Sequence, residues 1–394
     1  MAVRREAGLT EGIVLSLVTF LPIMATVSLA PCIPLFHEHF AAVPGAQALV
    51  PMLVTLPAVF IAILSPIAGA LSDRFGRRRL LLGALILYGL CGLAPLLLDD
   101  LRAILASRVG VGAAEGMLMT VGKSLIGDYY DGPRRQQWVG VQGIIDACLG
   151  SLTWFLGGAL AQGGWRAPFL LYLISIPLFL AVAWKVWEPV GVALARSVRG
   201  PARTAFPWRT GAVIAIVTLF TSLMYFAYPV NIAGALRELG LASSGQIGAY
   251  TAIASIGTPL GALAFTRAAR LPGPLLIGIA LAFVGAGCLG IGMSTNPLTA
   301  TVFGFIEQVG NGVAGAALVT WALYCLPVEH RGRGMGVWST CLVAGIFLSP
   351  LVFTILSAPV GGIRPGFALF GLASLVGALV IGRLPLLRRL GAAA

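Results

Sequence analysis

The stretch GALSDRFGRRRLLLGAL, residues 69–85, gathers charge between two apolar runs. Asp73, Arg74, Arg77, Arg78 and Arg79 fall within seven residues, although only 10% of the chain is charged. Gly69 precedes these charges and Gly76 divides them. Because glycine has no Cβ, it tolerates tight turns and close helix contacts. We therefore expect a short polar turn at Gly76 between two apolar helices, and a close helix contact at Gly69.

The composition places this turn at a membrane surface. Of the 394 residues, 58% are hydrophobic, whereas soluble domains are about half apolar and a quarter charged. Apolar runs of roughly 20 residues recur, which is the length that crosses a bilayer. The net charge of +12 would suggest nucleic acid in a soluble protein. Here the basic residues lie in gaps between apolar runs, so we expect a lipid bilayer, and no nucleic acid, as partner.

The apolar runs predict twelve transmembrane helices. Their approximate bounds are 12–34, 47–71, 79–98, 101–124, 136–161, 167–187, 210–232, 245–267, 273–294, 297–325, 334–358 and 364–385. The first run resembles a signal peptide, but at about 19 residues it is long enough to span, so we keep it as a helix. With both termini cytoplasmic, 20 Arg and Lys fall on the cytoplasmic face and 4 on the other. This asymmetry predicts a multi-pass protein with both termini inside.

The chain repeats itself at intervals of 192 to 200 residues. GALSDRFGRRR at 69 matches GALAFTRAARL at 261, VGVGAAEG at 109 matches VGNGVAGA at 309, and GPRRQQWVG at 132 matches EHRGRGMG at 329. The polar, Arg-containing segment 188–209 separates the two copies. We predict an N-terminal six-helix bundle at 1–187, a cytoplasmic linker at 188–209 and a C-terminal bundle at 210–394. Two similar six-helix halves are typical of a transporter with its site between them.

Several motifs resemble those of the major facilitator superfamily. Residues 69–78, GALSDRFGRR, match at every position the superfamily's signature loop between helices two and three. LASRVGVG, residues 105–112, resembles a helix-four motif of the drug:proton antiporter branch. That branch also carries a Gly-Pro in helix five, which is missing from GSLTWFLGG at 150–158. The resemblance implies an all-α membrane fold of two pseudo-symmetric six-helix bundles, and the missing Gly-Pro weakens the case for antiport.

The resemblance also implies a cytoplasmic gate. It consists of Gly69, Asp73, Gly76 and Arg77, with Asp128 at the cytoplasmic end of helix four. We expect Asp73 and Arg77 to pair, with Asp128 beside them. A few charge-assisted hydrogen bonds of about 1.5–3 kcal/mol each suit a latch that must open and close. The alternative is a topology signal and a structural turn, which is how we interpret Arg74, Arg78 and Arg79.

Ionisable residues inside the predicted spans are functional candidates, because they are costly in a bilayer. They are Arg108, Glu115, Asp146 and Glu307. Three carboxylates at similar depth, drawn from both halves, predict a central cavity. A carboxyl group whose distance from an arginine changes would couple proton binding to conformation. The alternative is a permanently paired polar plug. Lys123 is interpreted as a residue that reaches the membrane interface.

Polar and aromatic residues on helices that line the cavity in this family are candidates for substrate contact. They are Gln142, Trp154, Tyr225, Tyr228, Asn231, Gln308, Asn311, Trp321 and Tyr324. His37, Glu38 and His39 are interpreted as a solvated outer loop. No phosphate-binding loop, nucleophile constellation or metal cluster is present in the sequence, so we expect no enzyme activity, no cofactor and no metal.

The sequence thus favours a proton-coupled secondary transporter that moves a small amphipathic molecule by alternating access. Efflux by antiport is the leading interpretation, in a monomer of the bacterial inner membrane. Two alternatives remain: a proton-linked importer of a nutrient or organic acid, and a lipid flippase or non-transporting receptor on the same scaffold.

Overall fold

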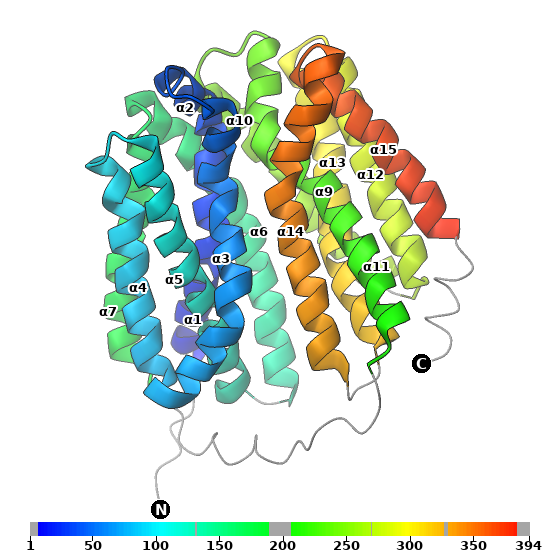
Figure 1. Ribbon diagram of the computed structural model, residues 1–394. Helices are drawn as coiled ribbons and strands as arrows, with labels where there is room; N and C mark the ends of the chain where they lie inside the picture. Colours follow the sequence, from blue (N-terminus) through cyan, green and yellow to red (C-terminus); the bar gives the residue numbers. More distant parts are fainter. Residues whose placement is uncertain (1–6, 131, 189–205, 269, 327–329, 384–394) are drawn as a thin grey trace, which may run out of the picture.

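The computed structural model describes residues 7–130, 132–188, 206–268, 270–326 and 330–383. Apart from short turns and loops, these segments are helical, and the helices stand side by side in two groups (Figure 1). Twelve helical stretches are long and apolar enough to cross a membrane, as predicted. The bilayer therefore explains the composition, because each span satisfies its own backbone hydrogen bonds.

The first six spans use these elements. Helix α1, Leu9–Leu29, continues through a turn at Ala30–Cys32 into α2, Ile33–His39. Then follow α3, Ala46–Phe75; α4, Arg77–Leu93; α5, Leu101–Tyr129; and α6, Gly132–Leu160. A 3₁₀ stretch at Ala167–Ile174 leads into α7, Ser175–Lys185.

The last six spans are α9, Trp208–Glu238; the pair α10, Ser244–Ser255, and α11, Gly257–Ala268; α12, Gly273–Met293; α13, Pro297–Cys325; α14, Arg331–Ser357; and α15, Ile363–Arg383.

The buried apolar side chains form two main clusters that follow this order. One draws almost entirely on α1 to α7, and the other almost entirely on α9 to α15. A few side chains cross, among them Val230 in the first cluster and Trp154 in the second. Residues 189–205 lie outside the described segments, so the predicted division into bundles and linker stays a prediction.

Helices α5 and α13 share a local design, as the internal repeat predicts. Each has 29 residues. Each begins with a side-chain cap: Asp100 accepts from the Ala103 N–H at 2.9 Å, and Asn296 accepts from the Thr299 N–H at 2.9 Å. Such caps satisfy backbone donors that a helix start leaves unpaired. The two fourth helices of the halves thus start in the same way.

Glycines bring α5 against α3. A Cβ at Gly112 would lie 2.4 Å from the Pro57 carbonyl oxygen, and one at Gly116 would lie 3.3 Å from that of Ile61. The expected close contact at Gly69 is wrong for this structure, because a Cβ there would meet nothing within 4 Å. The glycines that allow α3 and α5 to approach closely therefore lie on α5.

Contacts between the halves involve α6 and the end of the molecule near α2. A Cβ at Gly158 would lie 2.4 Å from the Ser244 carbonyl oxygen of α10, and Ser255 donates to Ser151 Oγ at 2.8 Å. Glu38 of α2 pairs with Arg237 of α9. Further along α6, a Cβ at Gly143 or Gly150 would meet nothing within 4 Å. The halves therefore touch where α6 meets α10, and helices α3 and α14 also contact each other.

The end of α9 is tied to the start of α15 by a carboxylate. Glu238 accepts hydrogen bonds from the backbone N–H groups of Ile363 at 3.1 Å and Arg364 at 3.2 Å. These donors belong to the first turn of α15, where an anion is favourable. A glutamate distant in sequence thus caps this helix.

Candidate functional site

The turn between α3 and α4 has the predicted geometry. Gly76 has φ = 88° and ψ = 146°, a conformation that favours glycine. Its N–H donates to the Ser72 carbonyl oxygen at 3.1 Å and closes α3, and α4 begins at the next residue. Asp73 lies in the last turn of α3, but its side chain is outside the described part of the structure, so its pairing with Arg77 stays a prediction.

Arg77 of α4 pairs with Asp128 near the end of α5. Both side chains are largely buried, with 5% and 14% exposed. Opposite charges at such a site are held together more firmly than at an exposed surface. The structure therefore joins two members of the predicted gate, and their action as a latch stays a prediction.

Glu188 caps the start of α4, and the sequence had not identified it as a site residue. Its carboxylate accepts from the backbone N–H of Arg77 at 2.8 Å and of Arg78 at 2.9 Å. Arg78 donates in turn to the Ala183 carbonyl oxygen of α7 at 2.6 Å. The residues that follow α7 are thereby fixed to the α3–α4 turn.

Arg108 is fully buried inside the first half. Its guanidinium donates to Tyr172 Oη at 2.9 Å and to the carbonyl oxygens of Cys91 at 2.9 Å and Gly92 at 3.4 Å. It also lies 5.1 Å from the ring centre of Phe169. These partners belong to α4 and to the stretch before α7. Arg108 is therefore a fixed tie between helices of one half, which favours the polar-plug interpretation over a mobile proton partner.

Glu115 lies on the same face of α5 and is 1% exposed. Arg108, Tyr88 and Tyr172 are near enough to interact with it electrostatically. Its Oε1 has no hydrogen-bond partner in the described structure. Burial of a charged carboxylate without such partners is costly. Glu115 is thus enclosed by its own half and lacks the bonds that would hold it charged.

Glu307 is the enclosed acid of the second half. It is 0% exposed and accepts from Asn311 Nδ2 at 2.9 Å and Gln308 Nε2 at 3.0 Å. Gln308 accepts from Thr258 of α11 at 2.5 Å. Each of these two glutamates thus interacts with residues of its own half, and the expectation that they share one central cavity with Asp146 stays a prediction.

Asp146 of α6 is partly exposed and faces a different partner from the one predicted. It interacts electrostatically with Lys123 of α5, while its Oδ1 is buried without a hydrogen bond. One turn earlier on α6, Gln142 donates to Thr19 of α1 at 2.9 Å. A Cβ at Gly122, next to Lys123, would lie 2.5 Å from the same threonine. The helices that carry Lys123 and Asp146 thus both pack against α1 at Thr19.

The remaining substrate candidates are divided between surface and interior. Tyr324 is 57% exposed, whereas Trp154, Tyr228 and Trp321 are buried. Tyr228 packs against Gly304, and Trp154 lies where α6 meets α10. Tyr225 lies near Glu307, and Asn231 donates to the Ala227 carbonyl oxygen of its own helix at 2.9 Å. Their contact with a substrate stays a prediction.

A family model described as Major Facilitator Superfamily matches residues 15–270 and 210–390, which together cover most of the chain. The chain belongs to the Major Facilitator Superfamily. The signature loop at 69–78 therefore identified the family correctly, and this family is one of membrane transporters rather than enzymes.

Three curated relatives of the chain are named as an exporter, a transporter and a resistance protein. The bacillibactin exporter of Bacillus subtilis is 31% identical over 164 residues, 40% of each chain. The 3-(3-hydroxy-phenyl)propionate transporter of Escherichia coli is 30% identical over 167 residues, 41% of this chain and 39% of the relative. The quinolone resistance protein NorB of Staphylococcus aureus is 31% identical over 172 residues, which are 43% of this chain and 36% of the relative. The alignments span about two fifths of these relatives.

A solved superfamily structure has the same fold. The inward-open xylose transporter XylE of Escherichia coli matches with a TM-score of 0.76 at 15% identity, covering 95% of both chains. At this identity the match concerns the fold alone.

The sequence did not indicate the contacts of two residues, Glu188 and Lys123, because their partners are distant in the chain. Glu188 was assigned to the linker, although a carboxylate after a span is a possible helix cap. Lys123 was interpreted as interfacial, although a lysine inside a predicted span was itself a signal.

Proposed function

We propose that the chain is a proton-coupled secondary transporter working by alternating access, and that Asp146 carries the coupling proton. The observation that carries this proposal is the pair of Asp146 and Lys123 beside α1. Asp146 is the partly exposed acid of the three, and its Oδ1 makes no hydrogen bond. Lys123 is the charged group among the described residues that interacts with it.

The coupling follows from elementary electrostatics. While Asp146 is ionised, its attraction to Lys123 holds α5 and α6 together beside α1. A proton on Asp146 removes that attraction and leaves the ammonium of Lys123 free to meet another group. Because α6 also contacts α10 of the other half, a shift of α6 changes how the halves meet. Proton binding is thereby linked to which side is open.

The other charged residues take supporting roles in this proposal. Arg108 fixes helices of the first half, and Glu307 is held by two amide donors in the second. Glu115, which lacks such donors on Oε1, is the second candidate for a proton site. Arg77 and Asp128 form the gate that holds one end of α5 against α4 and must part in the cycle.

Efflux of a small amphipathic molecule is the preferred direction. Two relatives are named as an exporter and a resistance protein, which supports it. Import of an organic acid is the second candidate, because the positive charge of Lys123 suits a carboxylate cargo. A relative named for transport of a phenylpropionate favours the same candidate.

The membrane orientation is part of the proposal. Both termini and the α3–α4 turn lie in the cytoplasm, because that orientation puts 20 basic residues inside and 4 outside. The protein then resides in a bacterial inner membrane as a monomer.

Transport in proteoliposomes tests the proposal with two probes: ethidium for a lipophilic cation and 3-(3-hydroxyphenyl)propionate for an organic acid. A pH gradient should drive one of them in the wild type. Asp146→Asn should abolish the dependence on the gradient, whereas Asp99→Asn, a matched change at an exposed loop residue, should preserve it. If both variants keep the dependence on the pH gradient, proton coupling through Asp146 is disproved. Opposite proton fluxes during movement of the two probes distinguish antiport from symport.

A further inference from the structure

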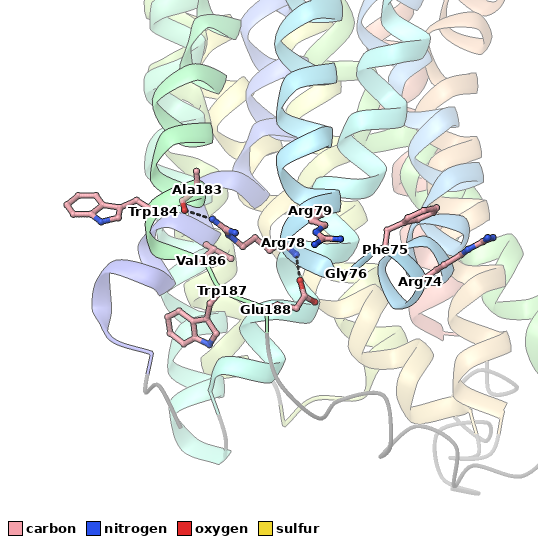
Figure 2. A pocket seen from close by; sticks show the side chains of 10 residues that line it. All are labelled: Arg74, Phe75, Gly76, Arg78, Arg79, Ala183, Trp184, Val186, Trp187 and Glu188. Carbon is pink, nitrogen blue, oxygen red and sulfur yellow. Dashed lines mark hydrogen bonds between the residues drawn. The ribbon is translucent and has the colours of Figure 1, made fainter. Parts of the chain in front are cut away.

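A cavity of about 590 Å³ lies beside the α3–α4 turn (Figure 2). The end of α3, the start of α4 and the end of α7 with the residues after it form its walls. Of the gate residues, Gly76 lines this cavity, whereas the paired Arg77 and Asp128 do not.

The cavity carries an excess of positive charge. Arg74, Arg78 and Arg79 line it, and Glu188 is the acid among its lining residues. The carboxylate of Glu188 is already bonded to two backbone N–H groups of α4. The three guanidinium groups are therefore not neutralised by ion pairs within the lining.

Most of the donors on these arginines are unused. Arg78 gives one hydrogen bond, to the Ala183 carbonyl oxygen, and its Nε is buried without a partner. Arg74 lies 5.5 Å from the ring centre of Phe75, and neither it nor Arg79 has a hydrogen bond or ion pair in the described structure. A guanidinium offers five donors, and its planar shape matches phosphate oxygens. The cavity thus suits an anion with several oxygens.

The surroundings place this cavity at the depth of lipid headgroups. Trp184 is 78% exposed and points away from the bundle (Figure 2), and Phe75 is 53% exposed. Exposed aromatic rings at the end of a span favour the membrane–water interface. Toward the membrane interior, α4 and α7 expose apolar side chains, among them Ile86 at 50% and Leu180 at 62%. Acyl chains can lie along this surface.

We propose that the cavity binds the phosphodiester headgroup of an anionic phospholipid, with Arg78 and Arg79 at the phosphate, Arg74 at the edge of the cavity (Figure 2) and the acyl chains along α4 and α7. A bound lipid would reinforce the α3–α4 turn from its membrane side. The proposal requires the membrane spans but not the proposed transport cycle, so either proposal can fail alone.

Native mass spectrometry of the purified full chain tests the site. The protein is titrated in a non-ionic detergent with dioleoyl phosphatidylglycerol, with dioleoyl phosphatidylcholine or with inorganic phosphate. We expect one phosphatidylglycerol to be retained preferentially. The double variant Arg74→Gln/Arg79→Gln should bind it at least about tenfold more weakly, the factor expected for loss of one charge-assisted hydrogen bond.

The matched control is Arg267→Gln/Arg270→Gln, which removes two exposed arginines near the end of α11 in the other half. It should keep the affinity of the wild type. Both double variants change exposed side chains, and circular dichroism checks that each remains folded. The proposal would be overturned if both double variants bound phosphatidylglycerol equally weakly. It would also be overturned if the protein retained phosphatidylcholine, or bound inorganic phosphate, as well as it binds phosphatidylglycerol.

Discussion

Replacing Gly158 with alanine should push the two halves apart where α6 meets α10. The added methyl group would lie 2.4 Å from the Ser244 carbonyl oxygen and 2.7 Å from Gly248 Cα. Ordinary contacts between such atoms are about 3.5 Å, so α6 and α10 must separate by roughly 1 Å here. Since both neighbours are main-chain atoms, no side-chain rotation relieves the clash.

The expected energy follows from the cost of overpacking, about 1–3 kcal/mol. This cost applies to the conformation described here and is absent from one in which α6 and α10 are apart. An energy of that size shifts the balance between two conformations by about 5- to 150-fold. Gly158→Ala should therefore favour a state with the halves separated near α2, or lower the melting temperature if no such state is accessible.

Gly150→Ala is the matched control on the same helix. A Cβ at Gly150 meets nothing within 4 Å, so alanine there should stabilise α6 by up to about 1 kcal/mol. Thermal unfolding compares the two variants. Spin labels at the exposed residues Ala42 and Ala242, after replacement of the exposed Cys148, report the distance between the halves at this end. Identical melting and identical distance distributions for the two variants would refute the reasoning.

Three further substitutions test single contacts. Glu188→Ala should lower the free energy of unfolding by about 1 kcal/mol, because the first turn of α4 loses its carboxylate cap; an unchanged denaturant midpoint would contradict this role. Tyr172→Phe should lower that free energy by about 1–3 kcal/mol, because Arg108 loses a buried acceptor, whereas Tyr324→Phe should change it by less than about 0.5 kcal/mol. Equal effects of the two tyrosine substitutions in thermal unfolding would show that the buried hydrogen bond is unimportant. Glu38→Gln should weaken closure near α2 by less than about 1 kcal/mol at low salt and have no effect at 1 M salt, as measured by the same spin-label distances; an effect that persists at high salt would exclude a screened ion pair.

The predictable features are those that depend on neighbouring residues in the sequence. Hydropathy gave the twelve spans, because crossing a bilayer requires a continuous apolar run. The positive φ of Gly76 followed from glycine between two helices. The pairing of Arg77 with Asp128 was expected only through the resemblance to a family, since 51 positions separate the two residues in the sequence.

The unpredicted features depend on how helices rotate against each other. Depth alone placed Glu115, Asp146 and Glu307 at one level, but depth does not tell which side of a helix faces a neighbour. The rotation of α5 and α13 encloses the two glutamates, whereas α6 leaves Asp146 partly exposed. His37, Glu38 and His39, interpreted as a solvated loop, belong to α2, where Glu38 pairs with Arg237 and His39 stacks on Trp165 at 4.7 Å.

Glu188 and Glu238 each bind main-chain N–H groups rather than side chains. Any residue except proline supplies such a donor. Evolution can therefore change the side chains at 77, 78, 363 and 364 without breaking either attachment, as long as the two glutamates remain. Among homologues, Glu238 should therefore vary less than residue 363, whereas Arg77 and Arg78 also belong to the signature loop.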